Sequence, residues 1–292
     1  MSFSIEQLAR HPKFVTALRF LSESLRNRYD SGPRIARMLA SHQRWLLTQS
    51  AYALHLEYDS AVPGSGLTVV GLRDLITRYR VASRNTVLSF IDELMTYRFL
   101  ELAPGSVRRP RRYVPTEVSF TAMFGWYLAN LAAIDLIDDG GRAAALVASP
   151  ALLDLAQPRM ARHCLATDIW REPPESVGLF LWTEAGGLVV DHIMSRLDLS
   201  GEVGDRIDIG RFDARALAAH FMISRTHLQR LLRKSAERGD IGWHDESKKT
   251  RMWVSREFLD QYCGWQAIKL AAVDEAFAWA QSVEGHDDTD PS

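Results

Sequence analysis

The chain has only two cysteines, Cys164 and Cys263, among its 292 residues. Two thiols cannot build a disulfide framework, so a reducing compartment is expected. The N-terminus also lacks the basic start and apolar run of a secretory signal. The most apolar stretch, 177–194, contains Glu184, Asp191 and three glycines, which favours a buried helix over a membrane span. We therefore expect a cytoplasmic protein without a membrane partner.

Patterns of common catalytic and cofactor sites are missing as well. The chain has no glycine-rich phosphate loop, no Gly-x-Ser-x-Gly and no His-Glu-x-x-His. His163 and Cys164 are adjacent, but no second ligand pair at zinc spacing accompanies them. Asp138 and Asp139 are expected to be solvated charges in a linker. The sequence thus predicts no enzymatic activity, no cofactor and no metal.

An internal repeat is present. Residues 125–135 return at 264–274 with six of eleven positions identical. A second match relates Val81-Ala-Ser-Arg84 to Met222-Ile-Ser-Arg225 at nearly the same offset, 141 against 139. Two matches at nearly the same offset indicate an internal duplication of one unit. In the Gly-Trp block the glycine is expected to let helices approach, and Trp126 and Trp265 to occupy equivalent places. The chain would then be an intramolecular pseudo-dimer, and further homodimerisation stays open.

In the first half, residues 4–28 and 33–58 carry helical spacing. The compact group 67–114 follows. It predicts a short strand at 67–70, a helix over 72–80, a tight turn, and a second helix from the N-cap Ser83 to Tyr97. Strands at 99–102 and 112–114 would form a basic hairpin.

The second half repeats this order over 207–254. A strand at 207–209 precedes helices over 214–221 and 224–238, and strands at 241–243 and 252–254 flank a basic loop. A helix over 257–280 then carries the second copy of the Gly-Trp block.

Regional charge separates these groups from the rest of the chain. Between Arg73 and Arg112 there are nine Arg against four Asp or Glu, and between Arg206 and Arg251 eleven Lys or Arg against six. Each group therefore carries an excess of five positive charges, although the whole chain has a net charge of −1. Two basic groups on an acidic body favour binding to nucleic acid.

The start of the second helix in each group offers the chemistry that reads DNA. Arginine can bind guanine, and asparagine adenine, through two hydrogen bonds in the major groove. Basic hairpins lie along phosphates or enter the minor groove. The candidate DNA-binding residues are Ser83, Arg84, Asn85, Thr86, Arg108, Arg109, Arg111, Arg112, Ser224, Arg225, Thr226, His227, Gln229, Arg230, Arg233, Lys234, Lys248, Lys249 and Arg251.

The group from Leu67 to Val114 resembles the winged helix-turn-helix of bacterial transcriptional regulators, broadly MarR-like or GntR-like, and Ile207 to Val254 looks similar. In the second group Thr226 stands one place earlier than in Ser-Arg-x-Thr, and His227 takes the place of Thr86. The resemblance covers about a third of the chain and implies double-stranded DNA as partner. The flanking helices match no known ligand-binding domain, so a small-molecule effector stays open.

The expected fold is mainly α with small β-hairpin wings, as two tandem winged-helix domains related by internal duplication, with additional packing helices. Its expected parts are a first unit over 1–140, a second over 141–283 and a disordered acidic tail at 284–292. The leading functional hypothesis is a sequence-specific regulator of transcription. A plasmid-type replication initiator with paired winged helices and a winged-helix protein-interaction scaffold are the alternatives.

Overall fold

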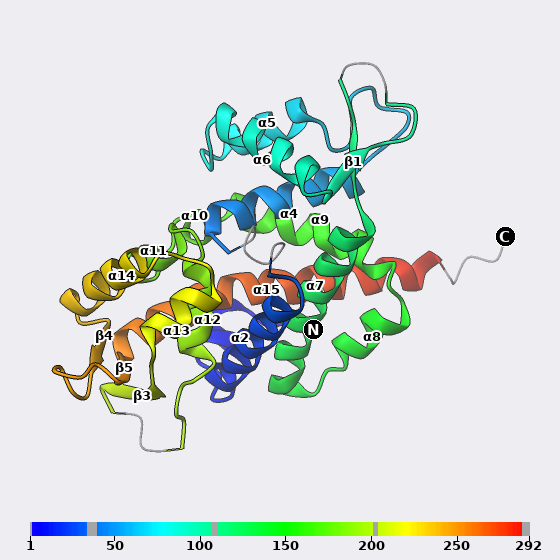
Figure 1. Cartoon of the computed structure of the whole chain (residues 1–292). Coiled ribbons are helices and arrows are strands. Elements are labelled where there is room, and N and C mark those ends of the chain that lie inside the picture. Colours follow the sequence, from blue (N-terminus) through cyan, green and yellow to red (C-terminus); the bar gives the residue numbers. More distant parts are fainter. Residues whose placement is uncertain (1, 34–39, 107–109, 201–203, 288–292) are drawn as a thin grey trace. The chain divides into compact units, whose positions relative to one another are not determined.

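The computed structural model describes residues 2–33, 40–106, 110–200 and 204–287. The chain is mainly helical and carries two small antiparallel sheets (Figure 1). It forms two compact units that interleave along the sequence. Unit 1 comprises residues 1–4, 43–171 and 268–292, and unit 2 comprises residues 5–42 and 172–267. The expected division into 1–140 and 141–283 therefore differs from the division by contacts, because the chain enters each unit more than once.

Unit 1 contains the first of the two basic groups. Its elements are α4 (His42–Leu56, from Gln43 onward), α5 (Val69–Arg78), α6 (Arg84–Thr96), β1 (Leu100–Leu102), β2 (Tyr113–Pro115), α7 (Glu117–Asp138), α8 (Arg142–Ala148), α9 (Leu152–Ala166), α10 (Asp168–Arg171) and the last part of α15 (Arg256–Asp287). Strands β1 and β2 pair antiparallel, with Leu100 opposite Pro115. Residues 67–115 are called the first segment below.

The strand expected at 67–70 is wrong. Thr68 forms only an isolated bridge with Arg112, and α5 begins at Val69. The Thr68 hydroxyl accepts a hydrogen bond from the Gly71 N–H and so caps the helix. A β-branched run favours a strand, but here the N-cap at Thr68 prevails because it satisfies an otherwise unpaired helix N–H.

Unit 2 contains the second basic group. Its elements are α1 (Ile5–Ala9), α2 (Phe14–Ser31), α11 (Glu175–Leu181), α12 (Gly186–Met194), β3 (Arg206–Arg211), α13 (Ala214–His220), α14 (Arg225–Glu237), β4 (Ile241–Trp243), β5 (Arg251–Ser255) and the first part of α15. The strand order is β3-β5-β4. Residues 206–255 are called the second segment below. It lies among the yellow and orange elements of Figure 1.

The helix expected over 4–28 is two helices, α1 and α2, separated around His11-Pro12. Proline restrains the residue before it and removes an N–H, so it ends or starts helices. The single buried helix expected over 177–194 is also two, α11 and α12, bent by 119°. Ala185 precedes α12 in the left-handed region, at φ 60°. Both parts are largely buried.

One helix of unit 1, α7, is long and apolar enough to cross a membrane by length and composition alone. Half of its most apolar window is buried inside the protein. Its buried side chains include Tyr127, Leu131 and Ile134. The Tyr127 hydroxyl donates to the Val273 carbonyl of α15 at 3.3 Å. These contacts are those of a core helix.

The tail expected to be disordered from residue 284 begins as helix, since α15 continues to Asp287. Ser149 donates a hydrogen bond to Glu284 at 2.5 Å, which ties this end of α15 to the residue that follows α8. Residues 288–292 lie outside the described part of the chain.

Candidate nucleic-acid interface

Each segment builds its second helix in the same way. In the first, the Ser83 hydroxyl accepts a hydrogen bond from the Thr86 N–H, and α6 then runs for 13 residues. In the second, Ser224 accepts from the His227 N–H, and α14 also runs for 13 residues. Ser83 was expected to be an N-cap, which is confirmed, and Ser224, expected as the first residue of its helix, is an N-cap as well. Each cap thus satisfies a backbone N–H in the first turn of its helix.

The residues that end these two helices also correspond. Arg98 follows α6 with φ 58°, and Gly239 follows α14 with φ 81°. After each of them the next N–H returns to a carbonyl five residues earlier, from Phe99 to Leu94 and from Asp240 to Ser235. Such left-handed ends stop a helix sharply. The hairpin strand therefore starts at the same distance from the helix in both segments.

The offset between the repeated sequence blocks changes inside the hairpin. Leu102 pairs with Tyr113 in the first segment, whereas Trp243 pairs with Met252 in the second. The first hairpin thus has two more residues between its paired strands. This difference accounts for the step from an offset of 141 to one of 139 in the sequence.

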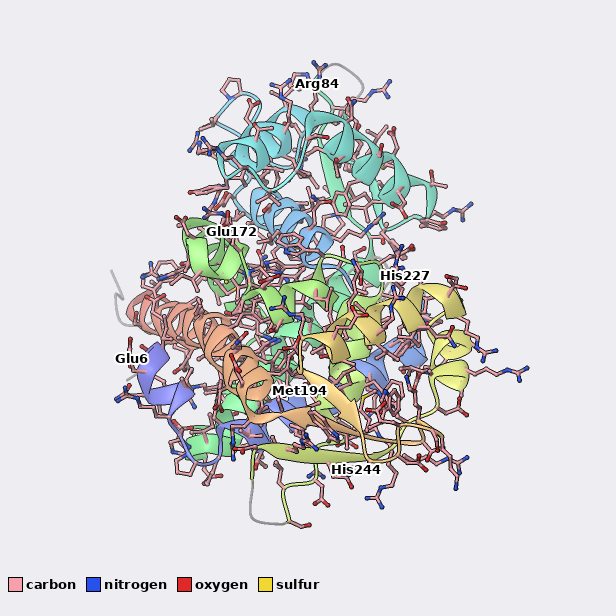
Figure 2. The ribbon with its side chains drawn as sticks, turned by 90° about the vertical axis from the view of Figure 1, so that its left-hand side faces the viewer. Glu6, Arg84, Glu172, Met194, His227 and His244 are labelled. Carbon is pink, nitrogen blue, oxygen red and sulfur yellow. The ribbon has the colours of Figure 1, made fainter. Side chains whose placement is uncertain are left out.

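The predicted helix-start residues are at the surface. Arg84 and Asn85 are exposed at the first turn of α6, as are Arg225 and Thr226 at the first turn of α14. Figure 2 labels Arg84 at the margin of the first segment and His227 near the start of α14. Thr86 is bound to the cap, with its hydroxyl 2.9 Å from that of Ser83. The hydroxyls of Ser83 and Thr86 are therefore already engaged.

His227 was expected to face outward and contact DNA, but its ring is engaged within the helix. Its Nδ1 lies 3.3 Å from the Arg230 guanidinium. Its Nε2 is shielded from solvent and makes no hydrogen bond within the described residues. The imidazole therefore supports Arg230 from the side of the helix. Beyond it the exposed face of α14 continues with Gln229, Arg230, Arg233 and Lys234.

Arg112 also differs from the expectation of a free cation on the hairpin. Its guanidinium lies 3.9 Å from the centroid of the Tyr58 ring. Its backbone carbonyl accepts from the Ala103 N–H, and its N–H donates to Ser106. Burial lowers the pKa of nearby His55, and the charge of Arg112 lowers it further. Arg112 therefore anchors the hairpin to the end of α4, whereas Arg111 is exposed. Arg108 and Arg109 lie outside the described residues.

On the second hairpin Lys248 and Lys249 are exposed, but Arg251 is paired. Its guanidinium donates to the Asp208 carboxylate, which also lies 3.2 Å from His244 Nε2. Burial opposes ionisation of Asp208, but hydrogen bonds from the Gly210 N–H and from Arg251 outweigh it, so the pKa of Asp208 is lowered. Arg251 is thus partly neutralised.

The sheet that carries this hairpin is stabilised by a cation–π contact. The Arg206 guanidinium lies 4.3 Å from the centroid of the Trp253 indole. Gly242, opposite Trp253 in the sheet, leaves room for the ring, since a Cβ there would lie 2.1 Å from it. This packing fixes β5 against β3 and β4. Arg206 is therefore held against β5, at the end of the sheet opposite the hairpin loop.

The repeated Gly-Trp block has a role that spacing alone did not reveal. Its last residue is Asp135 in one copy and Asp274 in the other, and both bind Arg142. Asp274 accepts from Arg142 Nε at 2.6 Å, and Asp135 accepts from its Nη1 at 3.2 Å. Asp138 completes the site at 2.7 Å. Asp138, expected to be a solvated linker charge, is exposed but is the last residue of α7. Its hydrogen bond from Arg142 lowers its pKa, although burial opposes this.

The glycine of this block was expected to let two helices approach closely, but Gly264 in the second copy does not have that role. A Cβ on Gly264 would meet no atom within 4 Å. The two tryptophans also differ, since Trp265 is buried and Trp126 is only partly so. Trp126 lies 5.8 Å from the Trp45 ring and under the Lys269 ammonium at 5.7 Å. Trp265 lies 5.3 Å from His42. The expected equivalence holds for the sequence but not for the surroundings.

Other chemistry is sparse among the described residues. No group of three His, Cys, Asp or Glu side chains is placed to hold a metal ion. Both cysteines are free and buried, and burial raises the pKa of each thiol to about 12. Cys164 packs in α9 with its Sγ 3.8 Å from Met160 Sδ. Neither thiol is suited to nucleophilic chemistry near neutral pH.

An open cavity of about 480 Å³ in unit 1 is lined in part by Glu57, Arg159, Arg162, His163 and Trp279. Both arginines are already paired, Arg159 with Glu275 and Arg162 with Glu57. Their charges are therefore largely satisfied within the protein. The question of a small-molecule effector therefore stays open.

Comparison with family models, with curated proteins and with solved structures finds no match to this chain. The functional assignment consequently rests on the chemistry of the two segments.

Proposed function

We propose that the chain binds double-stranded DNA through two winged helix-turn-helix segments and regulates transcription. The observation that carries this proposal is the paired helix start, in which a serine cap is followed by an exposed arginine, Arg84 in α6 and Arg225 in α14. A helix of this kind fits the major groove, where arginine binds guanine with two hydrogen bonds.

The order of elements supports the winged-helix assignment. Each segment has a first helix, a turn, a capped 13-residue helix and an antiparallel hairpin. The second segment adds β3 beside β5. The first segment has no strand equivalent to β3. There the Tyr113 N–H donates a hydrogen bond to the Leu67 carbonyl at 2.8 Å, so residue 67 lies beside β2 as β3 lies beside β5. The hairpins carry exposed cations at Arg111, Lys248 and Lys249.

The two helix starts differ, so the preferred DNA site is imperfectly symmetric. Asn85 in α6 can bind adenine through its amide, whereas α14 has Thr226 at that position. One polypeptide would thereby bind two unlike half-sites. Selection of bound duplexes from a random library identifies this site and tests binding itself.

The test of the assignment is alanine substitution at the helix starts. On the selected duplex, Arg84→Ala or Arg225→Ala is expected to weaken binding by about 1–3 kcal/mol and to relax the preference at one base pair. Arg10→Ala is the matched control, because it removes an exposed charge between α1 and α2, outside both segments. Equilibrium titrations at fixed salt measure both effects. Absence of binding to any duplex at low salt contradicts the proposal and favours a protein-interaction scaffold.

A further inference from the structure

The two capped helices can be compared residue by residue. Residues of α6 and α14 correspond at an offset of 141, from Arg84 and Arg225 to Thr96 and Glu237. The inward positions agree in burial, including Val87 with Leu228, and Ile91 with Leu232. The two helices therefore present the same set of positions to solvent, and their outward faces can be compared directly.

These outward faces carry opposite charge beyond the first turn. Ser89, Asp92 and Glu93 of α6 stand where α14 has Arg230, Arg233 and Lys234. Over its whole length α14 has four Arg or Lys and one carboxylate, whereas α6 has one Arg and two carboxylates. Capped helices of equal length and equal burial pattern are thus cationic in one segment and weakly acidic in the other.

Pairing within the protein affects the two faces differently. Arg233 lies 3.7 Å from Glu237, and its side chain is 69% exposed, so this ion pair is loose. Lys234 and Arg225 are exposed as well. In α6, Glu93 is held at 2.7 Å by Arg44 of α4, and Asp92 is exposed. The α14 cations remain available to phosphates, whereas Asp92 would repel them.

Each phosphate that a Lys or Arg neutralises releases condensed cations from DNA, which makes affinity fall with salt. A cationic face along three turns of helix can contact phosphates on both sides of a groove. The α6 face can offer the same only at its first turn, through Arg84 and the adjacent N-terminus of the helix.

Both segments carry the same excess of five positive charges in sequence, but only the second places cations along its capped helix. We infer from this placement that the two segments divide the work of DNA binding. The second segment supplies most of the sequence-independent, salt-dependent affinity, and the first contributes base contacts at the start of α6 with little phosphate binding. This inference rests on the proposed function and specifies how its two sites differ. It concerns the polyanionic backbone as the ligand of the α14 face.

Two double variants that remove equal charge test this division. Arg230→Ser with Arg233→Ser, called the α14 variant, removes two exposed cations from the second segment. Arg84→Ser at the start of α6 with Arg111→Ser on the following hairpin, together called the α6 variant, removes two from the first. Binding of the full chain to a random-sequence duplex is measured between about 50 and 200 mM salt, a range over which phosphate contacts dominate. The slope of log affinity against log salt is the readout.

The α14 variant is expected to lower the magnitude of the slope by about 2 and the affinity at least about tenfold. The α6 variant is expected to change the affinity for this duplex by less than about threefold. Circular dichroism and thermal unfolding check that each variant folds. Arg233→Gln with Lys234→Gln, which keeps helix-forming residues, serves if the serine variant does not fold.

Equal losses from the two variants, or a larger loss from the α6 variant, overturn the inference while leaving DNA binding itself in place. A wild-type chain that binds no duplex overturns the proposed function and this inference together. The two failures are therefore distinguished by the wild-type titration.

Discussion

In the first segment Thr68 caps α5 directly, while the second segment places the six-residue strand β3 ahead of α13 and closes a three-stranded sheet. Their second helices nevertheless have equal length and equal inward positions. The common part is set by buried apolar residues at helical spacing and by the serine caps. The outward residues are free of these constraints, so one architecture can carry two different charge patterns.

The largest expected effect is a loss of folding stability when Arg142, which binds the aspartates that end the two copies of the Gly-Trp block, is removed. Arg142→Ala removes the partner of Asp274, whose side chain is only 1% exposed. An unpaired buried carboxylate destabilises a fold, here by about 3 kcal/mol, although the Phe3 N–H still donates to it. Urea denaturation measures the loss.

Arg159→Ala is the matched control for this prediction, because Arg159 pairs with Glu275 at the surface. Exposed pairs contribute less than about 1 kcal/mol. If both substitutions cost the same free energy of unfolding, Arg142 has no special role in joining the repeated blocks.

A partly buried imidazole lies next to the second segment. His192 packs edge-on against Phe212 and Phe221 at 5.6 and 6.4 Å. Burial, with smaller contributions from Arg26, Arg196 and His220, lowers the pKa of His192 from 6.5 to about 3. Between these values the unfolded chain binds a proton that the folded chain does not. Stability from this group is therefore lost as pH falls below about 6.5.

His192→Phe keeps a ring against both phenylalanines and removes the titration. From pH 7.5 to 5 the wild type is expected to lose up to about 2 kcal/mol more than this variant, because one unit of pH corresponds to about 1.4 kcal/mol for one proton. Denaturation curves at both pH values give the difference. Parallel losses in the two proteins contradict the assignment of this pH dependence to His192.

The smallest expected effect concerns the second hairpin. Asp208→Asn removes the carboxylate that holds Arg251 and lies beside His244. Freeing a cation near phosphates is expected to raise affinity for any duplex about threefold at low salt. Titrations of wild type and variant measure the change.

Glu246→Gln removes an exposed charge from the same hairpin without releasing Arg251. It is the control for a general charge effect. An equal rise in affinity from both substitutions shows that the tie between Asp208 and Arg251 has no influence of its own.

Local signals in the sequence predicted the elements of the two segments well. The Ser83 cap, both capped helices and both hairpins lie within one residue or two of where helical spacing, the capping residue and the short strand patterns indicated them. These features depend on neighbours within a few residues. The error at 67–70 arose where two local preferences compete, because Thr68 suits a strand and an N-cap equally.

Long-range contacts limited the prediction of the site. Arg112 looked like one more cation of the hairpin, and only its position over Tyr58 shows otherwise. Arg142 was not singled out, since its partners Asp135 and Asp274 are far apart in the sequence. The recurrence of aspartate at the end of both Gly-Trp blocks was the one signal available. The difference between α6 and α14 could have been found by aligning the two repeats beyond their first matching residues.

The interleaving of the two units constrains how the chain acquires its structure during synthesis. Unit 1 needs residues 268–292 as well as 43–171, and unit 2 needs both 5–42 and 172–267. Neither is complete when the first half of the polypeptide leaves the ribosome, so the N-terminal residues must wait for partners made much later. The helix α15, which contributes residues to both units, is made after every other described helix of these units, so neither unit can be completed before it.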